Sequence, residues 1–247
     1  AFIQTVIDNA QKQQATASVA GIVGLVLALW SASGYVAGFM RAANRIYGLP
    51  EGRPIWKTAP VRLAITVFTV VCMIAGLIIV VATGAVADKL GQALGLGSTA
   101  VTIWDIAKWP VLLVIFVVML AVLYSAAPNV RQGGFRWISP GAVLAVVIWL
   151  LASGLFAVYV ANFSSYNKTY GSLAGVIVFL IWLWISNLAI LLGVELDAEL
   201  EHERAIKEGV PPKDELFAIP KDTRKFDDDV AADARRTTQI RRSSQSG

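Results

Sequence analysis

Long uncharged runs dominate the pattern of hydrophobic and polar positions along the chain. The clearest run extends from Thr169 to Val194 and separates a short polar turn from a series of alternating acidic residues. As a helix it would be about 39 Å long at 1.5 Å per residue, which exceeds the roughly 30 Å of a bilayer's hydrocarbon core. Four further runs match it: Gln13 to Met40, Leu63 to Ala87, Trp109 to Val130 and Trp137 to Asn167. The pattern therefore predicts five membrane spans.

These runs are continuous rather than alternating, so they favour helices over the strands of a membrane barrel. The composition agrees, since 56% of the residues are hydrophobic and only 15% are charged, against about a quarter charged in soluble proteins. We expect an all-α fold, a polytopic transmembrane helical bundle. Residues 1–209 would form this domain, and residues 210–247, polar and low in aromatic side chains, would be a disordered cytoplasmic tail.

The distribution of basic residues predicts the orientation of the bundle. Of the 21 lysines and arginines, only Lys12, Lys89, Lys108 and Lys168 fall on one side of the predicted spans. Under the positive-inside rule the other side, with the C-terminus, is cytoplasmic. Five spans would then leave Ala1 outside, and the chain does not begin with methionine. We therefore expect a further span upstream and six spans in the intact protein.

Small residues recur at helical spacing on several of the spans. Gly24, Ala28 and Ala32 form one such row, and Gly171 with Gly175 forms another. Rows of this kind let helix backbones approach closely, so internal packing is the favoured interpretation. A dimer seam or a groove that holds lipid remains open for individual rows.

Five acidic residues alternate at the end of the last span: Glu195, Asp197, Glu199, Glu201 and Glu203. On a helix they divide between two faces, and acids at a helix C-terminus oppose the helix dipole. They therefore need cationic partners. We expect a salt-bridged latch to the basic residues of the same side, among them Arg41 and Arg45, with Arg62, Arg131 and Arg136 as further candidates; the alternative is an ion site.

Asn187 is the notable polar residue inside the spans. A side-chain amide in hydrocarbon needs a hydrogen-bonded partner, so Asn187 should face another helix or a wet cavity. No acidic or basic residue falls in the middle of a predicted span. Pumps coupled to protons or ions usually carry such a residue, so this mechanism is disfavoured.

The sequence offers no catalytic, cofactor-binding or metal-ligating set. His202 is the only histidine and neighbours glutamates, whereas a metal needs three or four ligands. No nucleophile with a base, no glycine-rich phosphate loop and no aromatic and basic surface for nucleic acid can be recognised. The expected partners are membrane lipids; a homo-oligomer and a cytoplasmic or envelope protein partner stay open.

Three segments of the chain resemble a known family. They are YVANFSSYNKTYGSLAGVIVFLIWLWISNLAILLGVELDAELEHERA from Tyr159, LWSASGYVAGFMRAANRIYG from Leu29, and YSAAPNVRQGGFRWISPGAVLAVVIW from Tyr124. Together they are similar to the YihY/BrkB family of bacterial inner-membrane proteins. The most specific residues are Tyr166, Asn167, Tyr170 and Gly171 in the turn, with Gly193, Glu195 and Glu199 at the helix exit.

The resemblance implies six helices with both ends in the cytoplasm, in agreement with the distribution of charge. Members of the family are associated with envelope integrity and, in some cases, with movement of lipid or lipid-linked envelope molecules. Transport or flipping of such a molecule is therefore the leading functional hypothesis. A structural or assembly protein is the alternative. A membrane-embedded hydrolase or nuclease, suggested by an old ribonuclease label in the family, is a remote third because no such site can be assembled.

Overall fold

The computed structural model describes residues 2–82, 98–131, 139–162, 172–212 and 216–245. Their helices are α1 (Phe2–Ile46), α2 (Ile55–Val81), α4 (Ser98–Ala126), α5 (Pro140–Asn162), α7 (Ser172–Lys207) and α8 (Asp228–Gln245). Five helical segments are long and apolar enough to cross a membrane: Val23–Ile46, Ile55–Val81, Thr102–Ala126, Pro140–Ala161 and Leu173–Lys207. The predicted all-α polytopic bundle with five spans is confirmed.

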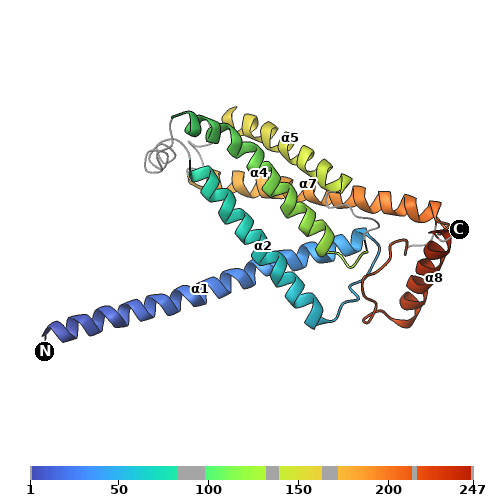
Figure 1. Ribbon diagram of the computed structural model, residues 1–247, viewed down its shortest axis with the longest axis horizontal. Coiled ribbons are helices and arrows are strands. Elements are labelled where there is room, and N and C mark those ends of the chain that lie inside the picture. The colour runs from blue at the N-terminus through green and yellow to red at the C-terminus, as the bar shows by residue number, and fades with distance from the viewer. Residues whose placement is uncertain (1, 83–97, 132–138, 163–171, 213–215, 246–247) are drawn as a thin grey trace.

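The spans are arranged around one extensive helix pair (Figure 1). Helix α5 packs along α7 more extensively than any other two described helices pack together, α4 lies against α5, and α2 contacts both α4 and α1. The first half of α1 projects away from the other helices, and only its second half joins the bundle. Helix α8 lies beside the end of α7.

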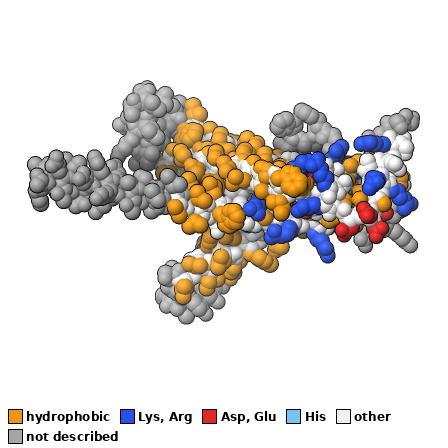
Figure 2. All heavy atoms as spheres, turned by 90° about the horizontal axis from the view of Figure 1, so that it is seen from below, with side chains coloured by type: hydrophobic (Ala, Val, Ile, Leu, Met, Phe, Trp, Pro, Cys, Tyr) orange, Lys and Arg blue, Asp and Glu red, His pale blue; other side chains and the backbone are white. Residues whose placement is uncertain are grey.

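Charged side chains gather at one end of the molecule (Figure 2). We call it the polar end and define it as residues 41–62, 125–131, 195–212 and 216–245. The buried hydrophobic cluster lies partly at this end, with Ala198 and Phe217, and partly in the adjoining turns of the spans, with Phe39 and Leu123. Between 6% and 22% of the residues in an apolar 18-residue stretch of each span are buried. A lipid bilayer accounts for this contrast, because apolar side chains exposed to hydrocarbon need no protein cover.

The tightest contact between helices joins α5 and α7. A Cβ added to Gly141 would lie 1.9 Å from the carbonyl oxygen of Gly193, and one added to Gly193 would lie 2.4 Å from that of Gly141. The backbones therefore meet where neither residue has a side chain. The contact also positions Asp197, whose Oδ1 accepts a hydrogen bond of 2.8 Å from the Gly141 amide at the start of α5. A carboxylate at the N-terminus of a helix interacts favourably with the helix dipole, so Asp197 stabilises the start of α5.

The prediction of a disordered C-terminal tail is wrong for the described residues 216–245. They form an extended segment and then α8, whose Ala231, Ala234, Thr237 and Arg241 are buried. These four residues recur at helical spacing and so face the bundle together. Composition concealed this face, because alanine, threonine and a paired arginine replace the large apolar residues that usually mark a buried stripe.

Candidate functional site

An apolar groove of about 430 Å³ lies between α2, α4 and α5. Its lining contains no charged side chain and is drawn from α2 (Cys72, Met73, Gly76), α4 (Trp109, Leu112, Leu113, Ile115, Phe116, Met119) and α5 (Trp149, Leu150, Ser153). On α4 the lining extends over about 15 Å of helix, half the thickness of a bilayer's hydrocarbon core. The groove can accept a hydrocarbon chain but offers an ion nothing to bind.

Aromatic side chains connect this groove to α7. The ring centroids of Phe116 and Trp149 are 4.5 Å apart, and those of Trp149 and Trp182 are 6.0 Å apart. The indole nitrogen of Trp149 donates to Ser186 Oγ at 3.0 Å, and that of Trp182 donates to Ser153 Oγ at 3.2 Å. Because the indole N–H of Trp149 has a partner, its ring presents apolar surface to the groove at no cost in hydrogen bonds, and Trp182 supports it from α7.

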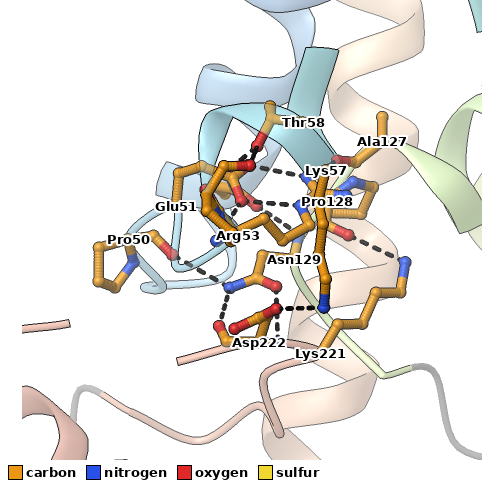
Figure 3. A network of polar contacts seen from close by, with 12 residues as sticks. Pro50, Glu51, Arg53, Lys57, Thr58, Ala127, Pro128, Asn129, Lys221 and Asp222 are labelled. Atoms are coloured by element: carbon orange, nitrogen blue, oxygen red, sulfur yellow. Dashed lines mark hydrogen bonds and ion pairs between the residues drawn. The ribbon is translucent and has the colours of Figure 1, made fainter. Parts of the chain in front are cut away.

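A second candidate region is the polar network around Arg53 (Figure 3). Arg53 follows the end of α1 and is 5% exposed. Its guanidinium binds both carboxylate oxygens of Glu51, at 2.7 and 2.8 Å, and donates to the carbonyl oxygens of Ala126 and Ala127 at 3.2 and 2.6 Å. Arg53 thus joins the loop before α2 to the end of α4, through the planar fork that matches a carboxylate.

The Glu51 carboxylate is also bound by Asn44 Nδ2 at 3.0 Å. Burial alone would raise the pKa of Glu51, but the hydrogen bonds and charge of Arg53, with the bond from Asn44, hold this pKa below its ordinary value. Glu51 therefore stays ionised at neutral pH. Its role is structural, since both of its oxygens are occupied by this network.

Asn129 connects the same network to the C-terminal segment. Its backbone amide donates to Asn44 Oδ1 at 2.7 Å, and its side-chain amide donates to the Asp222 carbonyl at 2.8 Å. Asn129 Oδ1 in turn accepts the Asp222 amide at 3.0 Å. Next to it, the Arg131 amide donates to the Ile219 carbonyl at 2.7 Å. The chain after α4 thus pairs with residues 219–222 almost as a neighbouring strand would.

Lys221 points back to this turn, and its ammonium group donates to the carbonyl oxygens of Ser125 and Pro128 at 2.6 and 3.0 Å. Burial, together with the charge of Arg53, lowers the pKa of Lys221 to about 8, although Glu51 acts in the opposite direction. Lys221 is thus still mostly protonated at pH 7, where its charge contributes to the positive field of this end.

Arg241 holds α8 against the end of α7. Its guanidinium is bound to Glu201, at 2.8 Å, and to Glu208, and it donates to the Phe217 carbonyl at 3.1 Å. Arg241 is 3% exposed and Glu201 is 5% exposed. Each of these two buried charges offsets much of the cost of burying the other.

Arg241→Met is expected to release α8, because it leaves Glu201 buried with only the partly exposed Arg204 as a partner, at 3.1 Å. Losing one member of a buried pair costs about 3 kcal/mol. Limited trypsin digestion of the whole chain in detergent should then cut α8 much faster than in the wild type. The control is Arg236→Met, an exposed arginine of the same helix. Equal digestion rates for the two variants would contradict the role given to Arg241.

The structure places Asn187 as the sequence predicted. Its Oδ1 accepts a hydrogen bond of 2.5 Å from the Tyr35 hydroxyl, and its Nδ2 donates to the Leu183 carbonyl at 3.0 Å. The amide therefore joins α7 to α1 within the spans, as a hydrogen-bonded contact between helices.

The predicted latch identified the wrong partners among the arginines that the structure describes; Arg136 lies outside the described residues. Glu195 and Glu199 are exposed, as are Arg41 and Arg45, and no ion pair among the described residues joins either acid to either arginine. The division of the acids between two helix faces is confirmed, but the buried face carries Asp197 and Glu201. The turn residues Tyr166, Asn167, Tyr170 and Gly171 lie outside the described residues.

Sequence reasoning missed most of the Arg53 network and the clamp at Arg241. Asn44, Glu51, Asn129 and Asp222 come from three distant parts of the chain, so no local spacing links them. The one available signal was the turn at Pro128 and Asn129, because an asparagine after a helix often bonds to backbone. For metals, the described ranges hold no group of three or more His, Cys, Asp or Glu residues placed to bind one.

Comparison with known proteins identifies the family. The family model described as Virulence factor BrkB matches residues 1–216. The chain belongs to the BrkB family. Among curated BrkB relatives, the putative ribonuclease-like protein YfkH of Bacillus subtilis is 30% identical over 188 residues, which cover 76% of this chain and 68% of YfkH.

Two further relatives carry the family designation UPF0761 membrane protein. The one from Idiomarina loihiensis is 34% identical over 43% of this chain and 37% of its own length. The one from Xanthomonas campestris pv. campestris is 26% identical over 88% of this chain and 49% of its own length. The chain thus spans less than half of these two relatives. No solved structure matches it. The BrkB chain is a multi-pass integral membrane protein.

Proposed function

We propose that this BrkB protein binds a lipid or lipid-linked envelope molecule and moves it across or along a bacterial inner membrane. The observation that carries the proposal is the uncharged groove between α2, α4 and α5, which is lined by residues of three different spans. Hydrocarbon is the ligand that such a lining suits, because burying a charged or strongly polar molecule there would cost its hydration without replacement. No catalytic step forms part of the proposal.

The proposal includes an orientation, with the polar end and the C-terminus in the cytoplasm. The excess of lysine and arginine at this end supports it under the positive-inside rule. In this orientation Trp109, which lines the groove, lies toward the outer face, and Lys108 lies over its ring at 5.9 Å. An aromatic ring beside a lysine is typical of the membrane interface. The groove would therefore open near the outer headgroups.

The test is movement of a fluorescent phospholipid between the leaflets of liposomes that contain the whole protein. Gly76→Phe should slow this movement about tenfold, because a ring at Gly76 would occupy the groove and add a barrier of about 1.4 kcal/mol for an acyl chain. Its Cβ would meet only Leu112 Cδ2, at 3.6 Å, so the first side-chain carbon is accommodated without a clash. The matched control is Gly154→Phe on α5, where an added Cβ meets nothing within 4 Å.

Two outcomes would count against lipid movement as the function. One is a wild-type rate equal to that of empty liposomes for neutral, anionic and lipid-linked probes. The other is an equal rate for Gly76→Phe and wild type. Either result would favour the alternative, a structural or assembly protein that binds a partner at the polar end.

A further inference from the structure

A pocket with a volume of about 480 Å³ and a mostly basic lining lies at the polar end; neither the apolar groove nor the Arg53 side chain forms part of it. We call it the basic pocket. Its lining comprises Lys57 of α2, Arg131 after α4, residues 219–224 (Ile219, Pro220, Lys221, Asp222, Thr223, Arg224) and, from α8, Ala234, Arg235, Thr238, Gln239 and Arg242. Six of these side chains are basic and one is acidic. Four separate segments of the chain thus bring like charges together.

The acid of the basic pocket is already occupied. Asp222 is paired with Lys57 at 2.8 Å and with Arg224 at 3.7 Å. The hydrogen bond from Lys57 is the main cause that lowers the pKa of the Asp222 carboxyl, so it stays ionised at neutral pH. Asp222 therefore neutralises part of the lining and organises it, but cannot balance six cations.

Three arginines of the basic pocket are exposed and have no acidic partner among the described residues: Arg131, Arg235 and Arg242. Arginine heads left without a carboxylate are free to bind an external anion. Charges of one sign along a concave wall also focus the electrostatic field and raise the local concentration of counter-ions. The lining thus has both free donors and a field that attracts anions.

The chemistry of the lining matches phosphate in particular. A guanidinium presents a planar fork of N–H groups that binds two phosphate oxygens at once, and several forks suit a group with more than one negative charge. Gln239 adds a neutral donor beside them. A surface that served only to orient the protein in the membrane would need no such concave arrangement, because the positive-inside rule depends on the number of basic residues near the spans.

The position of the basic pocket makes it accessible from the membrane surface. Lys57 belongs to the first turn of α2, next to Ile55 and Trp56, which are 70% and 72% exposed. An exposed tryptophan and isoleucine at the start of a span favour the level of the headgroups. A phosphate group can therefore reach the basic pocket from a lipid headgroup or from the aqueous phase.

We propose that the basic pocket binds a multiply charged phosphate group, a phosphate monoester or a pyrophosphate, with Arg131, Arg235 and Arg242 as its principal donors. The group belongs either to an anionic lipid or to a soluble phosphate compound. This inference does not rest on lipid movement, since a protein that moves no lipid can still bind the anion.

The test measures binding of inorganic pyrophosphate to the whole protein in neutral phosphatidylcholine nanodiscs, at constant ionic strength. Arg235→Gln with Arg242→Gln should weaken binding about tenfold or more, because two charge-assisted contacts are lost. The control pair, Arg236→Gln with Lys207→Gln, removes the same charge from exposed positions outside the basic pocket and should change binding less than about twofold. Both pairs lie at exposed positions, so both variants should fold, which unfolding temperatures will verify.

A second arm distinguishes the two sources of phosphate. If a lipid headgroup occupies the basic pocket, nanodiscs that contain phosphatidic acid should abolish pyrophosphate binding. If the ligand is soluble, they should leave pyrophosphate binding unchanged. Either result, together with the tenfold loss in the Arg235→Gln and Arg242→Gln variant, supports the anion site. Equal weakening by both variant pairs would overturn it, as would the absence of binding to pyrophosphate and to phosphatidic acid alike. Failure of lipid movement in liposomes would leave these measurements unaffected.

Discussion

Gly193→Ala should destabilise the bundle far more than the exchange of Gly154 or Gly175 for alanine in the same two helices. The added methyl would lie 2.4 Å from the Gly141 carbonyl oxygen, 2.4 Å from the Tyr124 hydroxyl and 2.8 Å from Ala145 Cβ. Two of these atoms belong to a backbone or to a buried ring, so α5 and α7 must move apart. Overpacking of this kind costs about 3 kcal/mol or more. We expect a large fall in the unfolding temperature of the detergent-solubilised protein, or loss of monodisperse protein altogether.

Two glycines of the same helices serve as controls for this prediction. An alanine methyl at Gly175 of α7 or at Gly154 of α5 meets nothing within 4 Å. Each exchange should leave the unfolding temperature unchanged or raise it slightly, since alanine favours a helix more than glycine does. If Gly193→Ala behaved like these two variants, the close approach of α5 and α7 would be incorrect.

Arg53→Met should cost about 3 to 5 kcal/mol of stability at the polar end. The substitution leaves the Glu51 carboxylate with only the Asn44 amide as a described side-chain partner, and leaves the Ala126 and Ala127 carbonyls without their donor. Breaking this pair on one side is expensive because the remaining Glu51 charge stays partly buried, with its side chain 27% exposed. For a chain of this size the unfolding temperature should fall by roughly 6 °C or more.

A second substitution distinguishes the remaining charge from lost packing. Glu51→Gln added to Arg53→Met removes that charge and should restore part of the lost stability. Arg45→Met, at an exposed position of α1, is the control and should change stability by no more than about 0.5 kcal/mol. A double variant less stable than Arg53→Met alone would show that the ion pair is not what holds this region together.

The membrane spans could be predicted from the sequence because each depends on a local property. An uncharged run long enough to cross hydrocarbon needs no knowledge of the rest of the chain, and the confirmed spans follow from this alone. The acids after Val194 were a partial success. Their need for cations follows from the helix dipole and from burial, and Glu201 does have such a partner in Arg241.

The identity of that partner could not be predicted, for a physical reason. Arg241 reaches Glu201 because α8 packs against the end of α7. The buried face of α8 consists mainly of alanine and threonine, so its hydrophobic pattern does not predict this packing. The same holds for the basic pocket. In the sequence, Arg235 and Arg242 are typical of an ordinary charged tail. They join Arg131 in one pocket only because residues 219–222 pair with the turn around Asn129.

The docking of residues 216–245 on the polar end has a consequence for how the protein is made. The ribosome synthesises this segment after all five described spans, so membrane insertion of the spans precedes the arrival of Asp222 and Arg241. Until then Glu201 has Arg204 but lacks Arg241, and the Asn129 side chain lacks its two hydrogen bonds to the Asp222 backbone. Assembly thus has two stages. The helices insert into the bilayer first, and residues 216–245 pack on the polar end only after α8 has been translated. A ribosome that stalls before α8 would leave a chain whose spans are inserted but whose polar end lacks residues 216–245. Membrane proteases that cleave exposed segments would then have access to the uncovered polar end.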